Sequence, residues 1–253
     1  MKPISTLASL ALKEYYRRKI LIVILLMMFL VAGTGLLSNP FTLGVQGRLM
    51  RDLALWFIEL FTVFFSLALA AGILPNEIER KLVYPFLARP ISRSQYLWGK
   101  FWAISLIVGA SDFFLGLELV LILRFSTSAW HWMVLGACLL LWIEAMVVIA
   151  FCLWFSTFMT APVTFASMVL LYVLGNLSHV YALTLTTGNP IMQWILLRIK
   201  SIIPYFDYFS IRSAVTHNHP VSFFYFVACI LYGIFYVLLA MLLAEAVFAG
   251  RDL

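Results

Sequence analysis

The sequence contains six apolar runs that are each long enough to cross the hydrocarbon core of a bilayer. A membrane-spanning helix needs about 20 consecutive apolar residues, and the runs cover residues 20–37, 53–74, 101–123, 130–158, 163–185 and 221–248. Hydrophobic residues make up 64% of the chain and charged residues 11%, with a mean hydropathy of +1.03, which excludes an ordinary soluble domain. The sequence predicts an all-α integral membrane protein with six transmembrane helices in one domain, residues 1–253.

The segments between these runs carry helical patterns of their own. Residues 3–19 place apolar residues against basic ones, which favours an interfacial helix. In residues 75–100, Asn76 with Glu79 and Ser92 with Gln95 form two capping boxes, each of which predicts a helix start. Residues 39–52 are predicted to be a turn-rich connection. Residues 186–220 are predicted to hold a short interfacial helix over 191–203, followed by an aromatic belt at the surface, made of Tyr205, Phe206, Tyr208 and Phe209.

The distribution of positive charge predicts the orientation of the chain. An N-terminus in the cytoplasm places eleven basic residues on that side: Lys2, Lys13, Arg17, Arg18, Lys19, Arg80, Lys81, Arg89, Arg93, Lys100 and Arg251. The opposite side then receives six, namely Arg48, Arg51, Arg124, Arg198, Lys200 and Arg212. Because basic residues accumulate in cytoplasmic loops, we expect both termini to be cytoplasmic.

No catalytic, cofactor or metal site is expected in this chain. It has no Gly-x-x-x-x-Gly-Lys-Ser/Thr loop, no Gly-x-Ser-x-Gly elbow and no His-Glu-x-x-His helix. The three cysteines fall in apolar runs without metal-ligand spacing. His217 and His219 are interpreted as part of a surface loop, with a weak metal site as the alternative. The net charge of +6 does not indicate nucleic-acid binding, because the basic residues flank apolar runs.

The acids Glu59, Asp112, Glu118 and Glu144 lie inside the predicted spans. An ionised carboxylate in the bilayer is costly unless it is paired, hydrated or protonated, so these residues are expected to face the protein interior. Stripes of small and polar residues, from Glu59 to Ala70 and from Ser105 to Gly116, predict helix contacts. Two interpretations stay open. The acids are satisfied by hydroxyls or by Arg48, Arg51 or Arg124, or they serve a substrate path or proton transfer.

The polar segment of residues 75–100 resembles the cytoplasmic loop of the type-two ABC exporter permeases. The matching positions are Glu79, Leu82, Leu87, Pro90, Ser92, Arg93, Leu97, Gly99 and Lys100. The resemblance implies that this loop is a coupling helix and contacts an ATPase through Glu77, Ile78, Glu79, Arg80, Lys81, Leu82, Phe86, Arg89 and Arg93. It also implies that residues 1–19 form an elbow helix. By the same resemblance the substrate path lies near spans two and five, which adds Tyr172, Asn176 and His179 to the candidate path residues.

The resemblance implies a permease subunit of an exporter in a bacterial-type inner membrane. Its expected partners are two ATPase chains that bind ATP and Mg, a second permease that is identical or related, and membrane lipids. Two other functions are weighed against it. A membrane scaffold or sensor would recruit the ATPase without moving a solute. An intramembrane enzyme is disfavoured because no nucleophile and base share a helical face.

Overall fold

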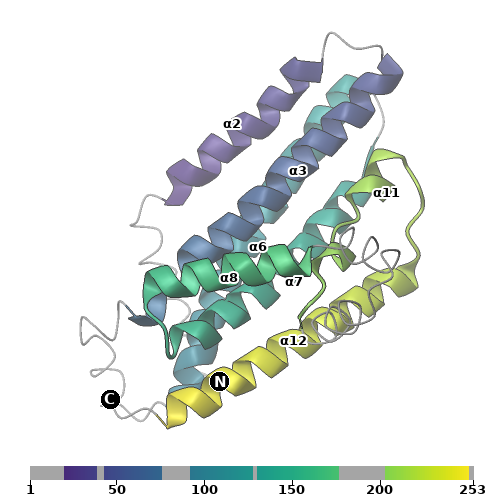
Figure 1. The fold of residues 1–253 in the computed structure, drawn as a ribbon. Helices are drawn as coiled ribbons and strands as arrows, with labels where there is room; N and C mark the ends of the chain where they lie inside the picture. The colour runs from purple at the N-terminus through teal and green to yellow at the C-terminus, as the bar shows by residue number, and fades with distance from the viewer. Residues whose placement is uncertain (1–19, 39–42, 76–91, 128–129, 177–202, 251–253) are drawn as a thin grey trace, which may run out of the picture.

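The computed structural model describes residues 20–38, 43–75, 92–127, 130–176 and 203–250, and within these ranges it contains helices and no strand. Its elements are α2 (Ile20–Ser38), α3 (Leu43–Ala70), α6 (Arg93–Thr127), α7 (Met133–Ser156), α8 (Ala161–Gly175), η1 (Phe206–Tyr208), α11 (Arg212–Thr216) and α12 (Phe223–Ala249). The long helices lie roughly side by side, with α11 near one end of the bundle (Figure 1). We call this the α11 end and the opposite end, where α6 begins, the Arg93 end.

Four of the helices are long and apolar enough to cross a membrane: 47–75, 93–126, 133–156 and 223–249. Two shorter apolar helices, Ile22–Thr34 and Ala161–Gly175, lie within the predicted spans one and five. The structure therefore confirms an all-helical protein with membrane-spanning helices. The count of six spans stays a prediction.

Helix α7 is the centre of the bundle. It packs against α6, α12, α3 and α8. In its most apolar stretch 72% is buried inside the protein, compared with 28% in the corresponding stretch of α12. A helix that is apolar around its whole circumference suits this position. Glycines let the neighbours approach closely: a Cβ on Gly109 would lie 2.5 Å from Trp142 Nε1 of α7, and one on Gly233 of α12 would collide with Ile143.

The start of α6 confirms the second predicted capping box. The Gln95 backbone N–H donates to Ser92 Oγ and the Ser92 backbone N–H donates to Gln95 Oε1, each over 3.2 Å. These two bonds satisfy backbone donors that the first turn of a helix leaves without partners. The helix then continues into the apolar run without interruption, as the sequence predicted.

The prediction of a turn-rich connection over residues 39–52 was wrong for its second part, because α3 already begins at Leu43. The polar residues of this extension find partners in other elements. Arg51 Nη2 donates to the Thr216 carbonyl oxygen over 2.9 Å, and Arg212 forms an ion pair with Asp52. These contacts give partners to Arg51 and Asp52, the two polar residues that directly precede the apolar run. The helix can therefore extend beyond the run.

The predicted aromatic belt was also wrong for two of its four residues. Phe206 and Phe209 are 1% and 0% exposed and belong to the core. The Phe206 ring lies 4.9 Å from the Tyr172 ring of α8, and the Phe209 ring lies 5.9 Å from Tyr232 of α12. The segment turns inward because the short helix η1 directs these rings between α8 and α12. The interfacial helix predicted over 191–203 lies outside the described residues except for its last residue.

Candidate functional site

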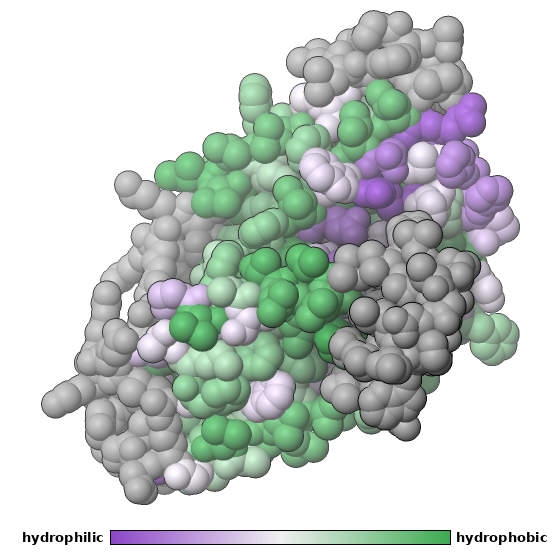
Figure 2. Space-filling model, viewed as in Figure 1, coloured by the Kyte–Doolittle hydropathy of each residue, from purple (hydrophilic) through white to green (hydrophobic). Residues whose placement is uncertain are grey.

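Hydrophilic residues gather in a strip at the α11 end of the molecule, bordered by hydrophobic surface (Figure 2). Arg48, Asp52 and Glu59 of α3 share one face of that helix, because they are spaced by four and seven residues. Arg212, the first residue of α11, approaches both acids. Its Nε lies 3.3 Å from Asp52 Oδ1 and its Nη1 lies 3.8 Å from Glu59 Oε2. These contacts hold the short helix α11 against α3 at two positions that are two helical turns apart.

A cavity of about 350 Å³ opens between α3 and α8 beside this strip. Its walls are largely apolar, and its polar groups come from three different elements. The lining residues are Trp56, Glu59, Leu60, Val63, Phe64 and Leu67 of α3, Val169, Tyr172 and Val173 of α8, Asn176 at the C-terminal end of α8, and Arg212 of α11. We call this cavity the α3–α8 pocket. It has the mixed character of a small-molecule site, with apolar walls and a few polar groups that fix orientation.

Three of the predicted path residues, Glu59, Tyr172 and Asn176, meet in the α3–α8 pocket. The Tyr172 hydroxyl lies close enough to Asn176 and to Glu144 of the central helix for their side chains to interact. Glu144 is 1% exposed, and its Oε2 has no hydrogen-bond partner among the described residues. A chain of polar groups therefore leads from the pocket through Tyr172 into the middle of the bundle.

Asp112 lies elsewhere and serves a helix contact. It is 1% exposed, and the Thr62 hydroxyl of α3 contacts its Oδ1 over 2.7 Å. Ser66, one turn further along α3, donates from Oγ to the Thr62 carbonyl oxygen over 2.6 Å. A hydroxyl as the partner of a buried acid is one of the two interpretations that the sequence analysis left open. Asp112 is not among the residues that line the pocket.

The remaining predicted site residues are less informative. Glu118 of α6 has one buried oxygen, Oε2, without a hydrogen-bond partner in the described ranges, and it does not line the α3–α8 pocket. His179 and eight of the nine predicted ATPase contacts, all except Arg93, lie outside the described residues, as do the elbow helix 1–19 and most of the loop between α3 and α6. The role of these residues in ATPase contact stays a prediction.

Arg93 belongs to a set of contacts that joins the start of α6 to the end of α12. Its Nη1 donates to the Phe248 and Ala249 carbonyl oxygens over 2.8 and 3.0 Å. Glu245 Oε1 accepts from Ser94 Oγ over 2.8 Å and from Trp98 Nε1 over 2.6 Å. We call this set the α6–α12 latch. It fixes residues 93–98, the last part of the predicted coupling loop.

A second polar set lies at the α11 end, where Arg51 bridges three elements. Besides its bond to Thr216, its Nη1 lies 3.2 Å from Nε2 of His131, which lies between α6 and α7. Burial, and then the positive charge of Arg51, lower the pKa of His131. A neutral ring nitrogen can accept from the guanidinium, so this contact requires the unprotonated ring.

Sequence reasoning missed Arg212 and Ser210 as site residues. Ser210 Oγ donates to Glu59 Oε2 over 3.4 Å, while the sequence counted Arg212 only as one of the outer basic residues. No spacing rule connects them to Glu59, because Ser210 is 151 residues away along the chain and Arg212 lies two residues further. The only available signal was the length of the segment 186–220, which was too long for a simple turn.

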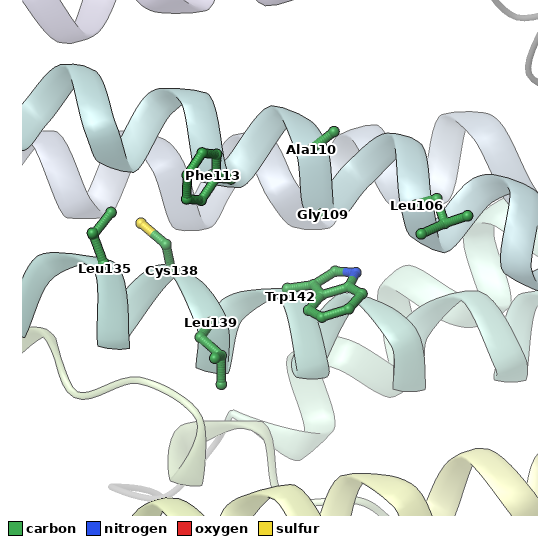
Figure 3. Close-up of a pocket in the computed structure, with 8 residues that line it drawn as sticks. All are labelled: Leu106, Gly109, Ala110, Phe113, Leu135, Cys138, Leu139 and Trp142. Carbon is green, nitrogen blue, oxygen red and sulfur yellow. The ribbon is translucent and has the colours of Figure 1, made fainter.

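A second cavity, of about 490 Å³, lies between α6 and α7 and has a different character (Figure 3). Leu106, Phe113, Leu135 and Leu139 line it together with Gly109, Ala110, Cys138 and Trp142. Its one strong donor, Trp142 Nε1, is already bonded to the Ser105 carbonyl oxygen over 2.8 Å. This groove offers no free strong donor to orient a polar solute and suits the hydrocarbon surroundings of a bilayer.

The helices that are long and apolar enough to cross a membrane define a multi-pass helical membrane protein. Residues 6–253 match the family described as ABC-2 family transporter protein. The chain therefore belongs to this family and is a permease subunit of an ABC transporter, a membrane subunit that associates with ABC ATPase partners. A comparison with curated proteins finds no match.

Proposed function

We propose that this permease exports a solute across the inner membrane and that the α3–α8 pocket is part of its path. The observation that carries the proposal is the placement of Glu59, Tyr172, Asn176 and Arg212 around one cavity between two apolar helices. Charged groups at membrane depth mark substrate or ion pathways, because lipid does not solvate them. The family match supplies the transport function into which this pocket fits.

A second permease chain is proposed to cover the open side of the pocket. The two helices that form its walls present large exposed apolar side chains: Trp56, Leu60 and Phe64 on α3 and Val173 on α8 within the lining, and Val163 and Leu170 elsewhere on α8. A partner seated across these residues would enclose the cavity between two permeases. Whether that partner is identical or related does not change the role of the pocket.

Energy input is proposed to come from two separate ATPase chains that bind ATP and Mg. Residues 71–92 join α3, which carries one wall of the pocket, to α6. A push on this loop would therefore reach the pocket directly through α3 and would reach α12 through the α6–α12 latch. Rigid displacement of packed helices is a common way to carry such a signal. In the proposed orientation the Arg93 end and both termini are cytoplasmic.

The coupling loop provides the test of this function. A Leu or Phe side chain buried in a partner contributes roughly 1.5–3 kcal/mol, and about 1.4 kcal/mol changes affinity tenfold. Leu82→Ala and Phe86→Ala should therefore weaken co-purification of the ATPase about tenfold or more while the permease still inserts. Leu231→Ala, at an exposed site on α12, is the control that should not change it.

The same preparations distinguish a transporter from a scaffold. ATP hydrolysis that depends on the permease, together with solute movement in vesicles, supports export. An ATPase that binds but drives no solute movement indicates the scaffold function. Full retention of the ATPase by both loop variants would show that this segment is not the coupling element.

A further inference from the structure

At the polar end of the α3–α8 pocket, the guanidinium of Arg212 is shared between two acids. Glu59 lies in the wall, and Asp52, Asp207 and Glu144 are close enough to act on it or to be acted on by it. Of the pocket-lining residues, only Arg212 is cationic, and it is shared. Its contact to Asp52 is 3.3 Å long, and its contact to Glu59 is 3.8 Å, at the limit of an ion pair.

Glu59 is the acid that lines the cavity, and its contact with the cation Arg212 is weak. Its side chain is 20% exposed, and its other contact, from Ser210 Oγ, is long at 3.4 Å. Arg212 can stay with Asp52 and leave Glu59 to a ligand. Behind the wall, the unpartnered Oε2 of buried Glu144 adds a second acceptor next to Tyr172. An anionic ligand would meet several carboxyl groups and a guanidinium that is already engaged.

The rest of the cavity fits an apolar body. Trp56 and Phe64 of α3 are 43% and 50% exposed, and Val173 of α8 is 48% exposed on the other wall. Aromatic rings also attract cations through their negative faces, at about 0.5–2 kcal/mol. The acid at one end of the pocket and the apolar walls along its sides thus favour a molecule that has a positive group and an apolar body.

Building on the proposed transport function, we propose that the α3–α8 pocket binds amphiphilic organic cations. The positive group would lie at Glu59, beside Tyr172 and Asn176, and the apolar part would extend along Trp56, Phe64 and Val173. Arg212 would act as the resident cation with which the ligand competes for Glu59.

Two probe ions of nearly equal size and opposite charge test this proposal. The permease–ATPase complex in lipid nanodiscs is titrated with labelled tetraphenylphosphonium and, separately, with labelled tetraphenylborate, and binding to protein-free nanodiscs is subtracted. The cation should bind saturably and the anion should not. Glu59→Gln should weaken cation binding about tenfold, equivalent to about 1.4 kcal/mol. Glu245→Gln makes the same chemical change in the α6–α12 latch and should leave binding unchanged.

A second variant is expected to tighten cation binding, which distinguishes a specific effect on the pocket from misfolding. Arg212→Gln removes the competing cation and should tighten tetraphenylphosphonium binding, a gain that an unfolded protein cannot produce. Equal binding of both ions, or weaker cation binding in Arg212→Gln, would overturn the proposal. ATP hydrolysis is measured on the same complex. If the wild-type complex hydrolyses ATP in a permease-dependent way but does not bind the cation, only the proposed ligand class is refuted. If the wild-type permease does not associate with the ATPase, the proposed transport function is refuted.

Discussion

At the scale of single residues, Asp112 shows that an acid inside a membrane helix can have a structural role. Thr62 Oγ1 lies 2.7 Å from Asp112 Oδ1 and 2.8 Å from the Ile58 carbonyl oxygen of its own helix. A hydroxyl has one proton and can also accept. An asparagine at position 112 could donate to Thr62 while Thr62 donates to Ile58, so the amide reproduces the contact between α3 and α6.

We predict that Asp112→Asn keeps normal expression, thermal stability and transport. Thr62→Val has nearly the same shape but leaves the buried carboxyl without its partner, and should destabilise the protein by about 1–3 kcal/mol. Ser66→Ala is the matched control, because within the described ranges the Ser66 hydroxyl bonds to the backbone of its own helix. Thermal unfolding in detergent checks the stability. A folded Asp112→Asn protein that has lost transport would instead assign Asp112 to the substrate path or to proton transfer.

Residue-level prediction from sequence succeeded where a local rule applied. Ser92 and Gln95 were predicted as a capping box, and they form one, because both partners lie within a single helical turn. Glu59 was flagged as a costly charge, but its partner Arg212 was not found. Pairing between residues far apart in the chain depends on how the helices pack, and periodicity within one helix carries no information on that.

At the scale of elements, the α6–α12 latch should hold two helix ends that are far apart in sequence. Glu245→Ala removes the acceptor of both Ser94 and Trp98. Hydrogen bonds to charged groups contribute about 1.5–3 kcal/mol each, so this end of α12 should open more readily. We predict faster amide exchange over residues 93–98 and 245–250, with the α11 end unchanged.

Glu245→Gln is the control for this measurement because its carbonyl oxygen can still accept. It should exchange like the wild-type protein at both ends of the bundle. Unchanged exchange in Glu245→Ala would mean that packing of Phe248, which is 0% exposed, holds the helix end without the latch.

Element boundaries were predictable to the extent that apolar runs define them. Helix α12 (Phe223–Ala249) closely matches the run over 221–248. Helix α3 begins ten residues before its run. Arg51 and Asp52, which directly precede the run, have their partners in distant parts of the chain: His131, Thr216 and Arg212. The inward turn of Phe206 and Phe209 was missed for a similar reason. Aromatic residues near a predicted membrane surface fit a belt and a core equally well until the neighbouring helices are placed.

At the scale of the whole molecule, the structure places Ser92 and His217 at opposite ends of the helix bundle (Figure 1). Single cysteines at these positions, in a background lacking Cys138, Cys152 and Cys229, should react with an impermeant thiol reagent from opposite sides of the membrane. The three native thiols are buried, so their removal should perturb the surface little. Labelling of both positions from one side would contradict the predicted topology.

The buried acids also constrain how the chain is made. Asp112 of α6 finds Thr62 on a helix that is synthesised earlier, so its partner already exists when α6 enters the membrane. Glu144 of α7 depends on Tyr172 of α8, which the ribosome adds later. A carboxylate at the centre of a lone helix disfavours insertion by about 2.5–3.5 kcal/mol. We therefore expect α7 to remain beside the translocation channel until α8 emerges, and both helices to enter the lipid as a pair.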